Sequence, residues 1–416
     1  MTRTNTLADV DILSHDVYAQ GIPHTEFRRL RQEAPVSWHN EPAPNSGFWA
    51  ITRWDDLVDV HRDYRTFSSE IGGTELEELD SDALETRRTM LETDPPRHTE
   101  LRKIVNPSFS RRAVATHEDT TRTIVRQILD EAAALGEFDF VEEVARALPI
   151  RMLSHLLGVP HDDAPRLFEW ADAIIYHADP DFTDVIFDRD DTDPYRLLPF
   201  RSPFSLEVFS YVDKLATARR RHPAGDVTSI LVGAEVEGEP LTDQELNTFF
   251  LLLLIAGNET TRHSLSQGVL AFTEYPDQAE RLRTDPSLMP TATEEILRWA
   301  CPQIHFRRTA TVDTEIRGVE IKAGDKVVTW YLSANYDEEV FSDPYNFDVG
   351  RKPNRHVTFG GGGPHLCLGN WLARLEVRVF FEELLGRGSQ IEIAGKVERV
   401  RSNFINGIKR LPVRIR

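Results

Sequence analysis

One short loop of the chain combines residues that are suited to holding a metal ion by a thiolate. It runs from Phe359 to Gly369, contains four consecutive glycines and carries one cysteine, Cys367. A glycine run costs conformational entropy, so it is kept where something approaches the backbone closely. An amphipathic segment follows, and the start of a helix favours a negatively charged sulfur. The pattern predicts a platform for a metal–thiolate bond, but a glycine-rich turn with a buried structural thiol has the same appearance.

A second unusual group of residues lies in the middle of a long predicted helix. The helical pattern runs from Leu241 to about Glu274, and Thr242 and Glu245 have the spacing of a capping box. Its centre, 256–261, brings a glycine, a carboxylate and two β-branched alcohols into an otherwise apolar stretch, where each lowers helix propensity. A local groove beside the helix explains this composition. An apolar half that continues into a polar half explains it equally.

Two further pairs of residues have the spacing of neighbours on one face of a helix. His98 and Arg102 lie four apart at the start of a predicted helix, so one face presents two cationic donors that suit a paired anion. A solvated basic face has the same spacing. Glu295 and Arg298 lie three apart on a short predicted helix. On a surface this pair is worth under about 1 kcal/mol, whereas breaking it in the interior costs about 3–5 kcal/mol.

The composition is that of an acidic globular protein. The chain has 416 residues, of which 40% are hydrophobic, and its 48 basic and 68 acidic side chains give a formal net charge of −20. This charge argues against nucleic acid as a partner, since phosphate binding needs a basic surface. Two cysteines, Cys301 and Cys367, are too few for a disulfide framework and are typical of a reducing cytoplasm.

Neither a signal peptide nor a membrane span is predicted. The first residues, Met1–Val10, lack an apolar core. The most apolar run, Phe249–Ala256, is less than half of the roughly 18–20 residues that cross a bilayer. We therefore expect a soluble cytoplasmic protein without a membrane partner.

Helices dominate the predicted elements, and short strands lie near both ends of the chain. The loop 69–92 and the acidic segment 176–203 lack a regular period, and we interpret the second as a mobile lid. No internal repeat or linker divides the chain, so the expected fold class is mostly α with small β-sheets, in one large unit. The predicted strands are 47–52, 308–312, 318–321, 325–330, 391–393 and 411–415.

Four separated segments together resemble one family, the soluble bacterial cytochromes P450, in their order and separations over almost the full chain. The resemblance implies the cytochrome P450 fold, a trigonal-prism-like helical domain with a smaller β-rich region. It also implies a single domain over 1–416, in which about 1–70 and 300–416 contribute most of the strands. The four segments are 94–99, 256–261, 295–298 and 359–369.

The resemblance implies haem b, iron protoporphyrin IX, as the cofactor. Cys367 then matches the axial thiolate of the iron, a ligand that favours cleavage of the O–O bond. Ala256 and Gly257 match positions that leave room for dioxygen. The residues that match the donors to the haem propionates are His98, Arg102, Arg308 and His365. The other expected cofactor contacts in the loop are Phe359, Gly360 and Gly369.

The resemblance also assigns catalytic and structural roles. Glu259 and Thr260 match the acid and the alcohol that hold water and deliver protons to dioxygen. Glu295 and Arg298 match the structural pair of the family, with Arg351 as the third member, and their role is to lock the fold behind the haem.

Two positions depart from the pattern of the family. Phe359 stands eight residues before Cys367 instead of seven, so the glycine run is one residue longer than usual. This length resembles members that hydroxylate terpenes, sterols and branched lipids, which points to an apolar substrate. Tyr336 follows Asn335 where the family usually has arginine, and we expect altered packing beneath the haem.

The implied activity is that of a monooxygenase, which inserts one oxygen atom of O2 into a C–H bond of a small hydrophobic substrate. Terpenoids, steroids, lipids and polyketide-like molecules are the expected classes. A peroxygenase, a non-oxygenating haem-thiolate enzyme and a haem carrier or sensor are the alternatives. The pair Glu259 and Thr260 argues against them, because peroxide-driven relatives often lack it and carriers do not need it.

A separate protein must supply the electrons, because no flavin or iron–sulfur motif lies in the chain. We expect a ferredoxin with its reductase, guided to the cysteine side by a local basic patch. The expected docking residues are Arg102, Lys103, Arg111, Arg112, Arg374 and Arg378. The substrate pocket is expected to be lined by the loop 71–90, the lid segment 175–204, two side chains of the long helix, and the segments 303–306 and 404–408, most of them apolar. The single residues expected there are Phe249, Leu253, Gln303, Ile304, His305 and Ile405.

Overall fold

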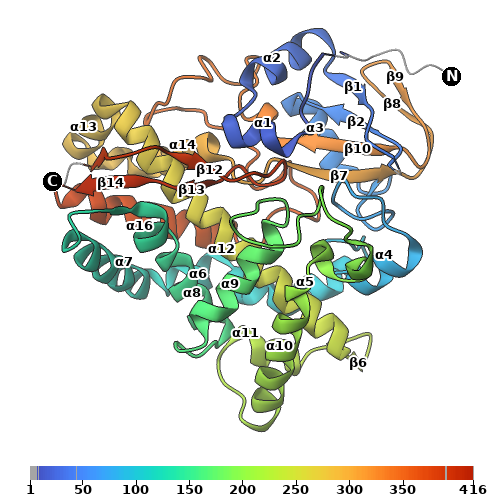
Figure 1. The fold of residues 1–416 in the computed structure, drawn as a ribbon, viewed down its shortest axis with the longest axis horizontal. Coiled ribbons are helices and arrows are strands. Elements are labelled where there is room, and N and C mark those ends of the chain that lie inside the picture. Colours follow the sequence, from blue (N-terminus) through green and yellow to red (C-terminus); the bar gives the residue numbers. More distant parts are fainter. Residues whose placement is uncertain (1–6, 8, 44, 389–390, 416) are drawn as a thin grey trace.

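Helix α12, Asp243–Glu274, crosses the middle of the fold (Figure 1). The expected capping box begins it: Thr242 Oγ1 accepts from the Glu245 N–H at 3.1 Å, and the Glu245 carboxylate accepts from the Thr242 N–H at 2.9 Å. Helices α8, α9, α10, α14 and α16 pack around it, so most of its side chains are buried on all sides. A helix surrounded in this way tolerates polar residues only where they find partners.

The chain is represented by a computed structural model that describes residues 7, 9–43, 45–388 and 391–415. Most of the N-terminal stretch that was expected to lack an export signal lies outside these residues. Within them, no helix is long and apolar enough to cross a membrane. The helices that contribute to the body around α12 are α5 (Arg97–Phe109), α7 (Glu118–Ala133), α8 (Ala147–Leu157), α9 (Ala164–Ile175), α10 (Phe204–Arg221), α14 (Met289–Ala300) and α16 (Asn370–Gly386).

Shorter helices connect this body to the strands. Helix α3 matters most for the site, because it reaches the glycine loop. The shorter α-helices are α1 (His15–Gln20), α2 (His24–Glu33), α3 (Trp54–Arg62), α4 (Ser81–Arg87), α6 (Arg111–Ala115), α11 (Val227–Val232), α13 (Pro276–Thr284) and α15 (Tyr331–Ala334). A π-helical turn covers Val141–Ala145, and 3₁₀ turns cover Asp193–Tyr195, Pro199–Arg201 and Pro286–Leu288.

The largest sheet joins strands from the two ends of the chain in the order β1-β2-β10-β7-β3. Strands β2 and β10 run parallel with Ala50 opposite Val328, and the other neighbours are antiparallel. Every residue of β2 and β10 is buried, as expected for strands covered on both faces. The bounds are β1 (Val36–His39), β2 (Phe48–Ile51), β3 (Phe67–Ser68), β7 (His305–Ala310) and β10 (Lys326–Trp330).

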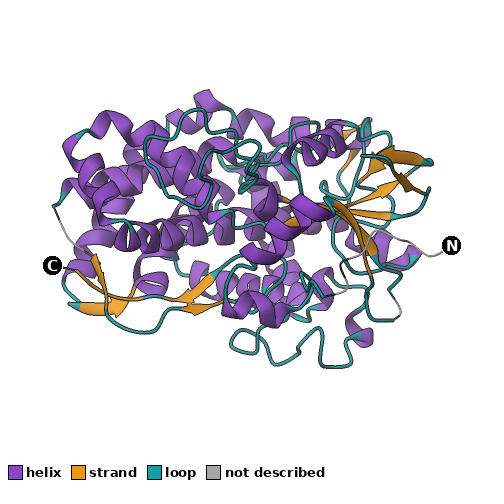
Figure 2. Ribbon diagram, turned by 90° about the horizontal axis from the view of Figure 1, so that it is seen from above, coloured by secondary structure: helices purple, strands orange, loops and turns teal. Residues whose placement is uncertain are grey.

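The remaining strands form smaller sheets, and Figure 2 shows the strands gathered in two places, near the two ends of the described chain. The two strands expected near the C-terminus do pair antiparallel, as β11 and β14, and β4 extends them to three strands, but β12 and β13 lie between them in the chain, so they are not a hairpin. A mostly helical fold with small sheets is therefore confirmed. The bounds are β4 (Glu137–Asp139), β5 (Glu235–Val236), β6 (Glu239–Pro240), β8 (Thr314–Ile316), β9 (Val319–Ile321), β11 (Ile391–Ile393), β12 (Glu398–Arg399), β13 (Ile408–Arg410) and β14 (Pro412–Ile415).

The acidic segment 176–203 is irregular, as expected, but ion pairs attach it to its surroundings. Arg401 donates to Asp188 at 2.7 Å, and its backbone N–H donates to Asp179 at 2.8 Å. Lys409 lies 3.2 Å from Asp179. The acidic side chains of this lid therefore hold it against the C-terminal part of the chain.

Glu77 joins three walls of the region beneath the lid. Its carboxylate accepts from Arg87 of α4 at 2.7 Å and also from Arg201 at the end of the lid. Its backbone carbonyl accepts from Arg307 of β7 at 2.9 Å. Both Glu77 and Arg87 are less than a tenth exposed, so this junction is screened little by solvent.

Candidate functional site

The backbone around Cys367 is fixed by hydrogen bonds at both sides. The Cys367 N–H donates to Phe359 O at 2.9 Å, and Asn370 Nδ2 donates to Cys367 O at 2.7 Å, just where α16 begins. Burial raises the pKa of the Cys367 thiol, and a backbone hydrogen bond from Gly369 with the charges of Arg102 and Arg374 acts against this without cancelling it. The helix start therefore does not by itself produce a thiolate. A bound metal ion is the agent that deprotonates a buried thiol.

The glycine run of the loop packs directly on helix α3. A Cβ added at Gly361 would lie 2.8 Å from Val58 Cα, and one at Gly363 would lie 2.3 Å from His61 O. These neighbours are backbone atoms or the first side-chain atom, which have little freedom to move. Gly363 also has a φ of 73°. The close approach expected from the sequence is thus made by α3.

The four expected anion donors gather beside this loop. The rings of His98 on α5 and His365 lie 4.2 Å apart, and His98 Nδ1 and His365 Nε2 are buried without a partner. Arg102 donates to Pro364 O at 3.2 Å and to Leu366 O. Buried Arg308 of β7 donates to Arg307 O at 2.7 Å.

The charges of this cluster are not balanced by the protein. Burial and the charges of Arg102 and Arg308 lower the pKa of His98 to about 4, and burial with Arg308 lowers the pKa of His365 well below its usual value. Among the described residues no carboxylate forms an ion pair with either arginine. One buried guanidinium group, one partly buried guanidinium group and two orphaned imidazole nitrogens fit a pair of carboxylates. The propionates of the expected haem have this chemistry, so the residues present fit the cofactor.

The centre of α12 borders a cavity of about 120 Å³. Ala256, Glu259 and Thr260 line it, and Thr260 Oγ1 donates back to Ala256 O at 2.8 Å, which is the hydroxyl-to-carbonyl bond that opens a local groove. Gly257 does not line the cavity: an added Cβ would lie 2.8 Å from Leu153 Cδ2 of α8. Gly257 thus allows close packing of two helices, and its expected role in leaving room for dioxygen stays a prediction.

Glu259 belongs to a buried polar network between α12 and α9. It accepts from Asn258 and Arg262, and Arg262 Nη1 donates to Asp172 at 3.1 Å. Burial raises the pKa of Glu259 well above its usual value, and the nearby Asp172 acts in the same direction, whereas Arg262 opposes the rise. Of the two acids, Glu259 is therefore the one whose pKa shift favours the protonated form.

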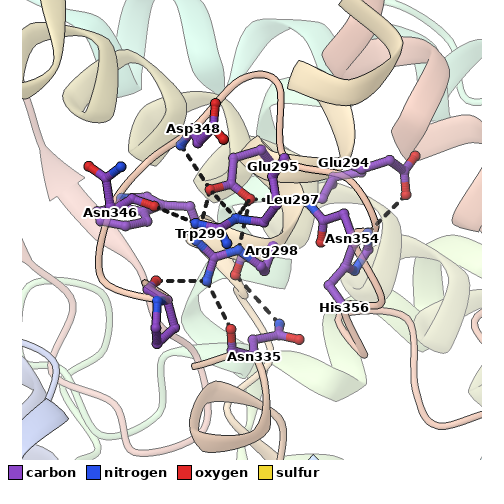
Figure 3. Close-up of polar contacts among 12 residues, drawn as sticks. Glu294, Glu295, Leu297, Arg298, Trp299, Asn335, Asn346, Asp348, Asn354 and His356 are labelled. Atoms are coloured by element: carbon purple, nitrogen blue, oxygen red, sulfur yellow. Dashed lines mark hydrogen bonds and ion pairs between the residues drawn. The ribbon is translucent and has the colours of Figure 1, made fainter. Parts of the chain in front are cut away.

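The expected structural pair lies in the interior (Figure 3). Glu295 and Arg298 are fully buried, with Arg298 Nε 2.8 Å from Glu295 Oε2. Arg351 Nε lies 3.0 Å from the same oxygen, and Asn354 Nδ2, which the sequence did not suggest, also donates to it at 3.0 Å. Arg298 Nη1 donates to Asn335 O at 2.9 Å. The surface alternative is thereby excluded for this pair.

Tyr336 fills the space over Arg298. The Arg298 guanidinium carbon lies 5.1 Å from the centre of the Tyr336 ring, a cation–π distance. The Tyr336 hydroxyl donates to Trp299 O at 3.0 Å. Tyr336 thus packs against the buried Arg298, at a position where the family usually has an arginine.

The lining of the cavity differs in part from the expected substrate pocket. Gln303 and Ile405 line it. Phe249, Leu253, Ile304 and His305 do not, and lie buried in the surrounding core. Phe306 and Phe404, from the expected segments 303–306 and 404–408, line it as well. Leu251, Leu252 and Ile255 also line the cavity and were not expected; they lie four or eight residues before Glu259 and Thr260, on the same face of α12.

Several expected docking residues already have partners. Arg374 lies 2.7 Å from Glu294, Arg378 2.7 Å from Glu118, and Lys103 2.6 Å from Glu100. Arg111 and Arg112 are exposed, and Arg111 lies over the ring of Trp371 at 5.1 Å. Leu366 and Trp371 are also exposed, which adds apolar area beside the loop.

Comparisons with known proteins agree with one another. The family model for cytochrome P450 matches residues 59–389. The chain is 38% identical over 410 residues to the steroid C26-monooxygenase of Mycobacterium tuberculosis, covering 96% of this chain and 91% of that protein. It is 40% identical over 418 residues to the methyl-branched lipid omega-hydroxylase of the same organism, covering 98% and 95%.

Solved structures show the same likeness. A Mycobacterium marinum cytochrome P450 in complex with pseudoionone has a TM-score of 0.88 at 39% identity, covering 98% of both chains. A Bacillus megaterium structure in complex with testosterone has a TM-score of 0.83 at 30% identity, covering 97% of this chain and 99% of that one.

Proposed function

The chain belongs to the cytochrome P450 family, and from this premise we propose that it hydroxylates a neutral, apolar terpenoid, steroid or branched lipid, with Cys367 as the ligand of its haem iron. The family makes it a haem-thiolate monooxygenase. The observation that carries the proposal for the site is the uncompensated cluster of His98, Arg102, Arg308 and His365 beside the cysteine loop.

We assign the cofactor contacts as follows. Cys367 binds the iron, and the four clustered donors hold the propionates through charge-assisted hydrogen bonds. Phe359, whose carbonyl accepts from the Cys367 N–H, and the glycines of the loop fix the direction of the sulfur. Ala256 presents a small side chain to the cavity.

The bound haem supplies the activation of O2 that the side chains of the chain cannot perform. The protein supplies protons and excludes competing groups. Glu259, whose pKa is raised by burial, passes a proton toward the cavity, and the Thr260 hydroxyl holds the water that carries it onward. Apolar side chains of α12 orient the substrate and keep bulk water out.

The substrate class is inferred from the cavity and from the relatives. The named relatives act on steroids and methyl-branched lipids, and one related structure holds pseudoionone. The side chains of Leu251, Leu252, Ile255, Phe306 and Phe404 give this cavity a matching apolar wall.

Electrons are proposed to come from a ferredoxin that docks over Leu366 and Trp371. The exposed side chains of Arg111 and Arg112 provide positive charge there, although the chain as a whole is acidic. The rate of reduction should fall as salt is added, because the attraction is screened. A rate that does not depend on ionic strength would contradict this docking surface.

A carbon monoxide spectrum of the reduced protein tests the ligand assignment. We expect the strongly red-shifted Soret band of a thiolate ligand, and Cys367→Ser should remove it while leaving the fold intact by circular dichroism. A folded wild-type protein that binds haem without this band contradicts the proposal.

Thr260→Ala tests the proton path. We expect normal substrate binding but a shift of NAD(P)H consumption from product to hydrogen peroxide. Thr248→Ala is the matched control, because Thr248 makes the same bond to a carbonyl of α12, at 3.0 Å to Gln244 O, away from the cavity lining. Unchanged coupling in Thr260→Ala contradicts the role.

A further inference from the structure

One carboxylic acid of the cavity wall is left without a protein partner. We propose that Glu75, in the loop between β3 and α4, donates a hydrogen bond to a carbonyl or hydroxyl oxygen of the substrate and thereby selects neutral, oxygen-bearing apolar molecules. The inference deepens the proposed function and depends on it, because it takes this cavity as the substrate site.

The other polar side chains of the loop that line the cavity are satisfied. Thr74 Oγ1 donates to Glu92 Oε1 at 2.7 Å. The Thr89 N–H donates to the other oxygen of Glu92 at 3.1 Å, and the Thr89 hydroxyl donates to it as well. Glu92 is therefore fully engaged and is not free to bind a ligand.

The polar side chains from other elements are also engaged. Gln303 Nε2 donates to His305 O at 2.8 Å, and Thr260 donates to Ala256 O. Glu259 is held by Arg262. Within the described chain, Glu75 is the lining carboxyl group that forms no hydrogen bond or ion pair. The Glu75 carboxyl group is open to the cavity, and a substrate that supplies a hydrogen-bond partner there gains an interaction that the protein itself does not provide.

The cavity offers nothing to a negatively charged ligand. Its two arginines are already paired, Arg87 with Glu77 at 2.7 Å and Arg88 with Glu70 at 2.6 Å. A free carboxylate would therefore enter an acidic wall without a counter-charge. This argues for a ketone or an alcohol and against a free fatty acid.

The surroundings keep Glu75 protonated. Burial raises its pKa to about 8, the carboxylates of Glu77 and Glu92 add to the rise, and Arg87 opposes it. The facing parts of α12 and of the lid are apolar: Leu251, Leu252, Ile255, Pro199 and Phe200. The side chain keeps some accessible area, as expected for a group that faces a cavity.

The charge state of Glu75 makes substrate binding depend on pH. A ketone accepts a hydrogen bond only from the protonated acid. Affinity for a ketone is therefore highest well below a pH of about 8 and falls as the pH rises through that value, by about fivefold from pH 7 to pH 9 for a hydrogen bond worth about tenfold in affinity. A hydrocarbon of the same shape needs no proton and should show no such loss.

The test compares androstanone, a saturated steroid ketone, with androstane, the same skeleton without the oxygen. Binding to the haem-loaded protein is measured by calorimetry and by the spin-state shift. Near neutral pH we expect the ketone to bind the wild type about tenfold more tightly than the hydrocarbon. Hexadecanoate should bind more weakly than the ketone.

The variants separate the hydrogen bond from the fold. Glu75→Leu should remove the preference for the ketone, whereas Glu75→Gln, whose amide still donates, should keep it and lose the dependence on pH. Glu85→Gln, an exposed acid on α4, is the control for charge and should behave as the wild type. Circular dichroism and haem content establish that each variant is folded.

Three results would overturn the proposal. They are an unchanged ketone preference in Glu75→Leu, equal ketone affinity of the wild type at about pH 7 and about pH 9, and tighter binding of hexadecanoate than of the ketone. The carbon monoxide spectrum reports separately on the proposed function. A missing thiolate band refutes that function, whereas the ratio of the affinities for the ketone and the hydrocarbon, measured by calorimetry, still tests the role of Glu75.

Discussion

The contact between the glycine loop and helix α3 gives a sharp prediction for Gly361→Ala. The new Cβ would lie 2.8 Å from Val58 Cα, 3.1 Å from His61 Cβ and 3.1 Å from Leu57 Cδ2. Carbon atoms in contact prefer about 3.5–4.0 Å, so the loop and α3 must separate by several tenths of an ångström or more. Overpacking of this kind costs about 1–3 kcal/mol.

The displacement should affect the cysteine more than the rest of the fold. Cys367 is tied to the loop by the bond from its N–H to Phe359 O, so a shifted loop changes the position of the sulfur. We expect a lower midpoint of urea unfolding and a reduced fraction of the protein showing the red-shifted carbon monoxide band. Both are measured on the same preparation at equal haem content.

Gly386→Ala is the matched control for this substitution. Gly386 is the last residue of α16, and a Cβ there meets no atom within 4 Å. Alanine in a helix is favoured over glycine by up to about 1 kcal/mol, so this variant should be as stable as the wild type or more so. If Gly361→Ala matches the wild type in both measurements, the loop does not depend on close approach to α3.

Two further predictions concern buried charges. Arg298→Met leaves the buried Glu295 carboxylate with one arginine partner fewer. The free energy of unfolding measured by urea titration should fall by about 3–5 kcal/mol. A loss below about 1 kcal/mol would contradict the burial of the pair. Burial alone would raise the pKa of Glu294, but hydrogen bonds from His356 and Arg374 bring it down to about 2. The carboxylate therefore stabilises the fold above its unfolded pKa, and this contribution is lost as the pH falls toward 2. Glu294→Gln should be less stable by about 1–2 kcal/mol near neutral pH, with a gap that narrows on acidification; a gap that stays constant would refute the argument.

Much of the fold and part of the site followed from local patterns in the sequence. The capping box of α12 and the pairing of Glu295 with Arg298 depend on residues three apart, so spacing alone predicts their contact. The composition of 325–330 predicts the strand β10, but its parallel neighbour β2 comes from the other end of the chain and no local pattern specifies that pairing.

The parts that were missed depend on distant neighbours. The partner of Gly361 is Val58, about 300 residues earlier, and Gly257 faces Leu153 of another helix. The sequence does not distinguish Glu75, Glu77 and Glu92, because all three lie in a loop without a regular period. The three-dimensional fold determines which of these carboxylates finds a hydrogen-bond partner. Burial also changed one expectation. The start of a helix beside Cys367 was expected to favour the thiolate, but desolvation of the sulfur raises the pKa of the thiol.

The junction at Glu77 limits how the cavity can be redesigned. Because one carboxylate holds both Arg87 and Arg201, the lid and α4 are not independent modules. An exchange of the lid between relatives must bring along an arginine at the position of Arg201, or Glu77 loses a partner two residues from the proposed anchor. Substitutions in the lid that remove Arg201 should then also change the proposed preference for oxygen-bearing ligands. When the protein is engineered for a new substrate, the lid and α4 should therefore be exchanged together.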